Sequence, residues 1–365
     1  MPKNGSPDTG PLGSVNGMWR LTRRSWLHLA GLTSLAGGLS AGSRLSGQAP
    51  SAAGSHATAH ELHAMGTVGR ITSDAIDPAS YLRAWNFSDL SAEKRSRVYR
   101  ESRRADGSLL REYEIYAVDR EIEIAPGIFF PAWTYNGQVP GPTIRATEGD
   151  RVKVTFKNLG SHPHTMHFHG WHASGMDGAL PGQEVHPGGT FVYEFDADPY
   201  GLHLYHCHTV PLKRHIHKGL YGAFIIDPKG GRPPADEMVM VMNAFDTNFD
   251  AENEVYAVNT VANAYMHEPI RVEVGRLVRI HLINLTEFDL INSFHLHAMF
   301  FDVFKTGTST TPSERTDTLM LCQGERAILE TTFRYPGDFM FHAHQSEFAE
   351  LGWMGLFRAE APVGS

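Results

Sequence analysis

Short runs of alternating apolar and polar residues, separated by glycine and proline, recur through most of the chain after residue 110. Residues 112–117 and 121–124 alternate in this way, and so do residues 151–158 and 277–284. Alternation with a period of two places successive side chains on opposite faces of a strand, so each run predicts a half-buried β-strand. Glycine and proline between the runs supply the turns. We therefore predict an all-β fold.

The same order of elements occurs twice along the chain. In each half a glycine turn leads into an alternating strand that ends in Asn-Leu, at Asn158 and at Asn284, and a His-x-His pair follows about ten residues later. Such an internal repeat predicts two related sandwiches of about 110 to 120 residues each. We place them at residues 111–228 and 235–361, joined by the Pro/Gly-rich linker at 227–234.

The first 59 residues differ from the rest in composition. Arg23 and Arg24 precede a mildly apolar run at 27–39, and Ser, Ala and Gly are frequent up to residue 59. This order is typical of a twin-arginine signal peptide, so we expect export to the periplasm or the cell exterior. Residues 60–110 form an irregular N-terminal extension, in which we expect a short helix within 92–104 and assign no chemistry.

Charge and cysteine content narrow the function. The formal net charge is −8 and no cluster of lysine or arginine stands out, so we expect no nucleic-acid partner. Of the two cysteines, Cys207 stands between His206 and His208 and is expected to act as a thiolate ligand. Cys322 is expected to be a small core residue of a strand.

Histidines are concentrated in pairs with one residue between them. Six such pairs occur, whereas 21 histidines spread at random over 365 residues would give about one. On a strand this spacing turns both imidazoles to one face, as a shared metal requires. Four pairs, two in each repeat at corresponding places, supply eight imidazoles, enough for a trinuclear metal cluster. These four pairs are His167/His169, His206/His208, His295/His297 and His342/His344.

The run around Cys207 predicts a second kind of metal site. If residues 205–208 end a strand, alternation sends Cys207 to one face and both flanking histidines to the other. A thiolate with two imidazoles is the blue-copper ligand set. One imidazole is expected from the pair His162/His164 and the other from the pair His215/His217, and we favour His164 and His215.

These motifs resemble the two-domain multicopper oxidases of the cupredoxin superfamily, relatives of laccases and nitrite reductases. The resemblance covers residues 133–357, and it implies two cupredoxin-like Greek-key β-sandwiches with four copper ions per chain, one type 1, one type 2 and two type 3. It rests on Tyr-Asn-Gly-Gln-Val-Pro-Gly-Pro at 135–142, Met-His-Phe-His-Gly at 166–170, His-Cys-His at 206–208, Gly-Leu-Tyr-Gly at 219–222 and Phe-His-Ala-His at 341–344.

The resemblance also implies a role for each ligand. His164, Cys207 and His215 would hold the type 1 copper, and His215 is favoured over His217 because the family places the axial residue five positions after this ligand, at Leu220. Alanine replaces cysteine between the last two histidines, so only the first domain is expected to hold a type 1 copper. The type 2 copper is assigned to His167 and His295, and the type 3 pair to His169, His206, His208, His297, His342 and His344.

The activity implied by the resemblance is laccase-like. A phenol or aromatic amine gives single electrons to the type 1 site, and Cys207 passes them through His206 and His208 to the cluster, where dioxygen is reduced to water. Protons must be delivered as well, and Asp177, Glu347 and Glu350 are the candidate relays. Relatives of this size share each cluster between two chains of a closed ring of three, so we expect a homotrimer.

Three alternatives remain open. A copper-containing nitrite reductase would need an aspartate where this chain has His167 and a non-ligand where it has His208. A cuprous or ferrous oxidase would take a cationic donor, which the basic residues next to His215 disfavour. A copper-binding electron carrier would need only one blue site and would leave eight paired histidines without a use.

Overall fold

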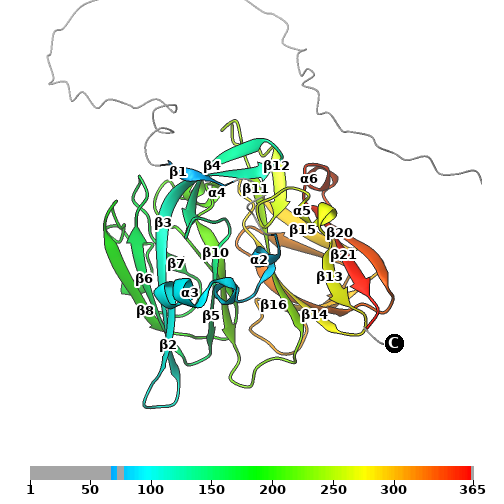
Figure 1. The fold of residues 1–365 in the computed structure, drawn as a ribbon, viewed down its shortest axis with the longest axis horizontal. Coiled ribbons are helices and arrows are strands. Elements are labelled where there is room, and N and C mark those ends of the chain that lie inside the picture. The colour runs from blue at the N-terminus through cyan, green and yellow to red at the C-terminus, as the bar shows by residue number, and fades with distance from the viewer. Residues whose placement is uncertain (1–66, 72–77, 363–365) are drawn as a thin grey trace, which may run out of the picture. The chain divides into compact units, whose positions relative to one another are not determined.

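Figure 1 shows the computed structural model of the chain, which describes residues 67–71 and 78–362. These residues form mainly β-strands in four sheets, which confirms the predicted all-β fold. The expected signal peptide, residues 1–59, lies outside the described residues. Among the described residues, no helix is long and apolar enough to cross a membrane.

The first sandwich consists of the strands up to residue 227. One sheet has the order β1-β3-β6-β8, with β2 and β4 also paired to β3, and the other has the order β5-β10-β9-β7. The strands of the first sheet are β1 (Thr67–Ile71), β2 (Tyr99–Arg103), β3 (Leu109–Ala125), β4 (Ile128–Tyr135), β6 (Arg151–Asn158) and β8 (Thr190–Asp196). Those of the second are β5 (Gly141–Thr147), β7 (His167–Phe168), β9 (Gly201–His206) and β10 (Tyr221–Asp227).

The second sandwich follows the same plan. Its sheets have the orders β12-β11-β14-β19-β16-β17 and β13-β21-β20-β15-β18. The strands of the first are β11 (Asp236–Phe245), β12 (Val255–Val258), β14 (Leu277–Asn284), β16 (Phe301–Lys305), β17 (Glu314–Thr316) and β19 (Arg326–Thr332). Those of the second are β13 (Ile270–Glu273), β15 (Ile291–Leu296), β18 (Thr318–Cys322), β20 (Gly337–His342) and β21 (Met354–Glu360).

The repeat read from the sequence is visible in the pairing of the strands. β6 lies between β3, which runs parallel to it, and β8, which runs antiparallel, and β14 lies in the same way between β11 and β19. In the other sheets β7 pairs with β9 and β15 pairs with β20. Both of these pairings set two histidines opposite each other, His167 against His206 and His295 against His342.

Short helices lie in the connections and in the extension. Two of them matter for the site, because α4 follows Cys207 and α6 follows the last histidine pair. The helices are α2 (Pro78–Leu82), η2 (Asn86–Asp89), α3 (Ala92–Val98), η3 (Ser174–Met176), α4 (Leu212–His217), α5 (Ala264–His267) and α6 (Ser346–Glu350).

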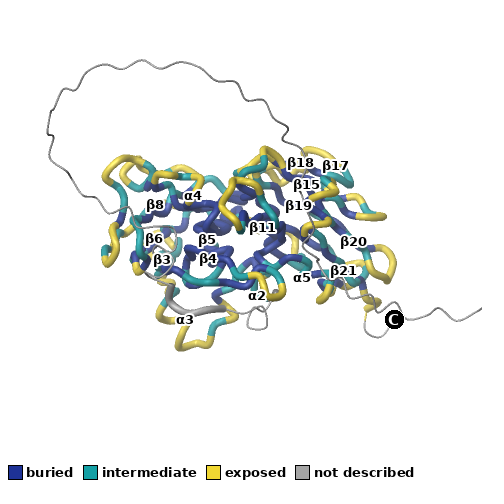
Figure 2. The backbone as a smooth tube through the Cα atoms, turned by 90° about the horizontal axis from the view of Figure 1, so that it is seen from above, coloured by how far each residue is buried: buried dark blue, intermediate teal, exposed yellow. Residues whose placement is uncertain are grey.

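The apolar side chains gather in three buried clusters, and the buried stretches of chain run through the strands in Figure 2. One cluster fills each sandwich, and the third lies between them, where Leu204 of the first sandwich and Phe245 of the second are both fully buried. Burying one such side chain contributes about 1.5–3 kcal/mol. The backbone joins the sandwiches as well, since Leu202 N–H donates to Thr306 O at 2.8 Å. The relation between the two sandwiches is therefore fixed by packing.

Two expected elements have different bounds. Residues 112–117 and 121–124, expected as separate strands, form the single long strand β3, because its first part pairs with β6 and its later part with β4. The helix expected within 92–104 ends at Val98, because the next five residues form β2 against β3.

Cys322 is not the core residue that was expected. It is exposed on β18, where Leu319 and Leu321 point into the core and Met320 and Cys322 point out. The alternation of the strand therefore places the thiol on the outer face.

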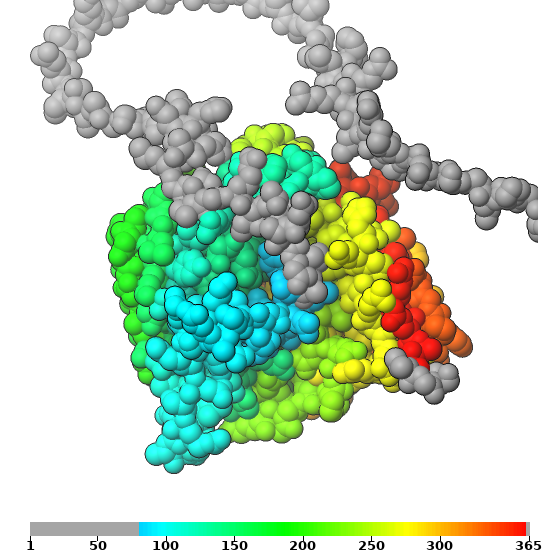
Figure 3. All heavy atoms as spheres, viewed as in Figure 1, coloured from blue at the N-terminus to red at the C-terminus, as the bar shows by residue number. Residues whose placement is uncertain are grey.

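Residues 80–110 of the extension lie on one face of the described structure and are coloured light blue to cyan in Figure 3. Its α2 segment reaches the second sandwich, where Arg83 forms a bridge with Met238 of β11. The rest packs on the first sandwich through an aromatic group in which Trp85 and Tyr99 approach edge to face at 4.9 Å. The described part of the extension therefore contacts both sandwiches.

Candidate metal centres

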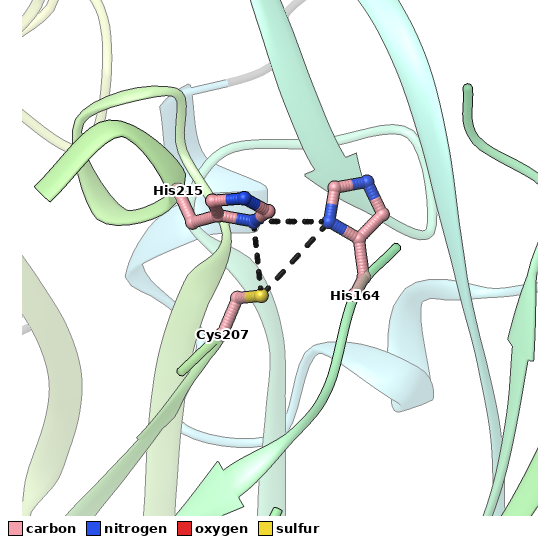
Figure 4. A group of neighbouring side chains, drawn as sticks. All are labelled: His164, Cys207 and His215. Atoms are coloured by element: carbon pink, nitrogen blue, oxygen red, sulfur yellow. Dashed lines mark hydrogen bonds between the residues drawn. The ribbon is translucent and has the colours of Figure 1, made fainter. Parts of the chain in front are cut away.

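The predicted thiolate site assembles from three loops that meet at one end of the first sandwich. Cys207 follows β9, His215 lies in α4, and His164 lies in the loop after β6, held by two backbone hydrogen bonds to Val185. Cys207 Sγ lies 3.2 Å from His215 Nδ1 and 3.9 Å from His164 Nδ1, and the two Nδ1 atoms are 3.2 Å apart (Figure 4). One thiol and two imidazole nitrogens therefore face a common point.

The environment of this triad suits a copper ion. All three side chains are buried, and burial lowers the pKa of His215 to about 4 and that of His164 well below its usual value. Both imidazoles are therefore neutral at pH 7 and present lone pairs. Burial raises the pKa of the Cys207 thiol, so a metal ion is what would hold it as a thiolate. Two imidazoles and one thiolate form the ligand set of blue copper.

The neighbours of the triad explain its shape. Thr165 N–H points at Cys207 Sγ at 3.4 Å, and the Trp133 ring lies 4.8 Å from the ring of His215. Leu220, the expected axial residue, is fully buried in the same apolar cluster as Cys207. The sulfur therefore lies in a largely apolar pocket and receives a hydrogen bond from the Thr165 amide.

The two histidines that we did not favour lie elsewhere. His162 is half-buried beside Trp133, with ring centroids 4.5 Å apart. His217 points to the second sandwich, where its Nε2 accepts a hydrogen bond from Asp246 N–H at 2.9 Å. The structure thus brings His164 and His215 to Cys207 and keeps His162 and His217 out of the triad.

On the other side of β9, four histidines of the first sandwich converge. The ring of His167 lies 5.2 Å from His169, 5.1 Å from His206 and 5.2 Å from His208. His169 Nε2 and His206 Nε2 are 3.3 Å apart. Burial lowers the pKa of His169 to about 3 and that of His206 to about 4, so both are neutral ligands at pH 7. We call this group the first half-cluster.

The second sandwich repeats this group, which we call the second half-cluster. The ring of His295 lies 4.9 Å from His297, 5.4 Å from His342 and 5.2 Å from His344. His297 Nε2 and His342 Nε2 are 2.9 Å apart. His297 and His344 are exposed, so this half-cluster opens to solvent in the isolated chain. The ligand atoms form two separate groups, one in each sandwich.

Hydrogen bonds to carbonyls orient two rings in each half-cluster in the same way. His206 Nδ1 lies 2.9 Å from Cys207 O, and His342 Nδ1 lies 2.6 Å from Ala343 O. His167 and His295 likewise place Nδ1 2.9 Å from a carbonyl, of Asp177 and Asp317 respectively. Since a carbonyl only accepts, each Nδ1 carries the proton and each Nε2 presents its lone pair to a metal.

The predicted proton relays differ in position. Asp177 follows η3, and its Oδ1 lies 3.2 Å from His167 Nδ1 and 3.9 Å from His172 Nε2. Glu347 and Glu350 are exposed residues of α6, and neither belongs to the metal-binding groups found among the described residues. The structure thus brings Asp177 to the first half-cluster.

Two residues that hold the loops of the half-clusters were not predicted from the sequence. Thr165 Oγ1 accepts a hydrogen bond from His208 N–H at 3.0 Å, and Ser293 Oγ accepts one from His344 N–H at 2.8 Å. The available signal was a hydroxyl residue two positions before His167 and His295 in both repeats. Each hydrogen bond therefore links the end of the second histidine pair of a half-cluster to the segment that carries the first pair.

Comparison with known proteins identifies the family of this chain. Sequence profiles described as multicopper oxidase match residues 120–231 and 232–362. A solved structure described as a multicopper oxidase is 54% identical, with a TM-score of 0.74, over 78% of this chain and 97% of its own. The copper-containing nitrite reductase of Neisseria gonorrhoeae is 30% identical over 247 residues, 62% of each protein. Laccase 1 of Metarhizium majus (strain ARSEF 297) is 41% identical over 104 residues, 27% of this chain and 16% of that protein.

These similarities cover the part of the chain that carries the thiolate triad and both half-clusters. The chain spans about 62% of the length of the curated nitrite reductases that it matches, whereas it covers nearly all of the 54% identical structure. The chain belongs to the multicopper oxidase family, whose members are copper-dependent oxidoreductases.

Proposed function

We propose that this protein is a laccase-like multicopper oxidase, which couples one-electron oxidation of a phenol or aromatic amine to four-electron reduction of dioxygen to water. The observation that carries the proposal is the presence of eight imidazoles in two matched half-clusters beside a single thiolate triad. An electron carrier needs only the triad. A trinuclear cluster needs all eight imidazoles.

The proposal assigns four copper ions per chain. When bound, copper supplies a one-electron acceptor at the triad of His164, Cys207 and His215 and the site of dioxygen reduction at the imidazoles. The type 2 ion is assigned to His167 and His295. The type 3 pair is assigned to His169, His206, His208, His297, His342 and His344.

The chain contributes a covalent path and a proton carrier. Cys207 lies in the triad, while its neighbours His206 and His208 lie in the first half-cluster, so two peptide links join the two centres. Asp177 can hold a proton within 3.2 Å of His167 Nδ1, at the edge of the half-cluster. Glu347 stays a candidate of the same kind.

The half-clusters also support an assembly. Each sandwich offers four imidazoles, and the second half-cluster is open to solvent. We propose that the first half-cluster of one chain meets the second half-cluster of the next, and that three such heterologous contacts close a homotrimer. The twin-arginine pattern of residues 1–59 supports a periplasmic or extracellular location.

The first experiment is copper content together with the absorption spectrum of the protein under air. We expect about four coppers per chain, a thiolate-to-copper band at roughly 600 nm and a shoulder at roughly 330 nm from a coupled pair. About two coppers without the shoulder would favour the nitrite reductase alternative, which the 30% identity to the Neisseria enzyme supports. Nitrite-dependent and oxygen-dependent turnover of the same sample then decide between them.

The assembly has its own test. His169→Ala removes a ligand of the first half-cluster and His297→Ala removes one of the second, so each variant alone lacks an intact cluster. In mixed trimers, an unmodified first half-cluster meets an unmodified second one at some interfaces. Mixing the unfolded variants and refolding them with copper should restore part of the near-ultraviolet shoulder. Clusters built within one chain would give no restoration.

A further inference from the structure

A cavity of about 580 Å³ lies beside the thiolate triad, at the seam between the two sandwiches. Trp133 and α4 residues Lys213 and Arg214 line it from the first sandwich, and Phe249 and Phe288 line it from the second. This volume falls within the range of small-molecule sites. No residue of the described part of the extension lines it.

Trp133 forms the wall between this cavity and the triad. Its ring lines the cavity and lies 4.8 Å from the ring of His215 and 5.3 Å from that of His164. His215 itself is only 3% exposed and does not line the cavity. A molecule in the cavity is therefore one aromatic ring away from the ligands of the type 1 site.

Two exposed cations and one buried cation line the cavity, namely Lys213, Arg214 and Lys218. Lys213 Nζ lies 4.7 Å from the centre of the Phe288 ring, and the Arg214 guanidinium lies 5.2 Å from that of Trp133. Both residues are exposed, and neither forms an ion pair with another described residue. Each cation thus lies at an aromatic face and remains available to an anion.

The two acids of the cavity are already engaged. Asp119 accepts hydrogen bonds from the amide and the hydroxyl of Ser161, the latter at 2.5 Å. Asp246 accepts from the backbone amides of residues 249, 250 and 251. Both acids are also buried, at 6% and 2% exposed, whereas Lys213 and Arg214 are exposed, so the exposed charge of the lining is positive, and aromatic rings form much of the walls.

We propose that this cavity binds an aromatic electron donor that carries an anionic substituent, with the ring against Trp133, Phe249 and Phe288 and the anion near Lys213 and Arg214. The inference rests on the proposed oxidase function and specifies its substrate class. A cationic donor, such as a cuprous or ferrous ion or a protonated amine, meets like charge at the same place.

Binding can be measured without turnover. The probes are 4-methoxybenzoate, 4-methoxybenzyl alcohol and 4-methoxybenzylammonium, which share a ring and differ in charge. They are titrated calorimetrically into the copper-loaded full chain under nitrogen. Two exposed ion pairs predict that the benzoate binds on the order of tenfold more tightly than the alcohol, and that the ammonium binds most weakly. Raising the salt concentration should reduce this preference.

Variants separate the charges from the shape of the cavity. Replacing both Lys213→Gln and Arg214→Gln should reduce the preference for the benzoate to less than about twofold while the alcohol still binds. Lys213→Gln alone, two residues from His215, should remove part of it. Lys305→Gln, at an exposed position of β16 outside the cavity lining, is the matched control and should keep the full preference. The visible band of each variant checks that the triad is intact.

The proposal is overturned if the three probes bind equally, if the preference survives in the double variant, or if no probe binds while the visible band is intact. Failure of the oxidase function has a different signature. A protein that binds the probes in the predicted order but consumes no dioxygen would retain the binding site and lose the oxidase assignment. Oxygen consumption together with equal binding of the three probes would retain the oxidase assignment and overturn the proposed binding site.

Discussion

The two sandwiches share one metal-binding plan, yet only the first carries a thiolate triad. His206 and His208 correspond to His342 and His344, and the backbone around them is held in the same way. Cys207 N–H donates to Leu220 O at 2.9 Å, and Ala343 N–H donates to Trp353 O at 3.2 Å. The hydrogen bonds of the strand ends therefore do not depend on the cysteine.

The side chains at these positions show what replaces the triad. Asn292 stands three residues before His295, as His164 stands before His167, and its side chain is hydrogen-bonded to Thr286 and Ser293. Trp353 is fully buried where the first sandwich has Leu220. In the second sandwich, packed and hydrogen-bonded side chains therefore occupy the place of the triad, while the half-cluster is retained. Half-cluster and triad are separable parts of the fold.

The largest effect is expected when Cys207 is replaced by alanine, the residue that stands at the corresponding position of the second sandwich. In Cys207→Ala the thiolate ligand is gone, so we expect the band at roughly 600 nm to vanish and one copper per chain to be lost. Donor oxidation should fall to background. The near-ultraviolet shoulder of the half-clusters should persist, as measured by absorption and metal analysis. Cys322→Ala, at an exposed thiol, is the control and should change none of these. Loss of the shoulder in Cys207→Ala would show that the two parts are coupled.

Much of this arrangement follows from sequence spacing. The His-x-His pairs lie at strand ends, where a period of two decides the face, so the sequence was sufficient to group His167 with His169 and His295 with His297. The opposite facing of Cys207 and its neighbours follows from the same rule. Side chains brought in by loops are different, because the position of His215 depends on where α4 begins.

The cavity could not be predicted, because its walls come from six segments that are separate in sequence. Phe249 and Phe288 follow β11 and β14 of the second sandwich, and they line the same cavity as Trp133 only because the two sandwiches share an apolar interface. The burial of Cys322 was predicted wrongly for a different reason. Its residue type favours burial, but the phase of its strand was set by Leu319 and Leu321.

A smaller effect is expected from the carboxylate that distinguishes the two half-clusters. Asp177 approaches His167 with its side chain as well as its carbonyl, whereas His295 contacts the carbonyl of Asp317 and the hydroxyl of Thr318. Asp177→Asn should lower turnover at saturating donor by about 10- to 100-fold through slower proton delivery, with the visible band unchanged. Turnover measured against pH should change its profile. Asp317→Asn is the matched control, and an equal loss there would contradict a proton role for Asp177.

The axial position offers a finer adjustment of the triad. Leu220 gives the type 1 ion no thioether, which favours Cu(I), so Leu220→Met should lower the reduction potential by on the order of 60 mV, tenfold in a one-electron equilibrium. Redox titration of the visible band measures the shift. Leu204→Met, a fully buried leucine of the apolar cluster between the sandwiches, controls for the change in volume and should leave the potential unchanged. An unchanged potential in Leu220→Met would mean that residue 220 does not face the metal.

The smallest effect on activity is expected from a pair of asparagines that the repeat places at the ends of β6 and β14. Asn158 donates to His162 O and Val185 O, both at 2.7 Å, and Asn284 donates to Leu321 O at 3.0 Å. Both are fully buried, so Asn158→Ala and Asn284→Ala should each lower the free energy of unfolding by about 1–3 kcal/mol, measured by chemical denaturation. Only Asn158 ties down the loop that carries His164. Asn158→Ala should therefore also release type 1 copper to a chelator faster than Asn284→Ala, and equal release rates would show that the loop is held by its backbone bonds to Val185 alone.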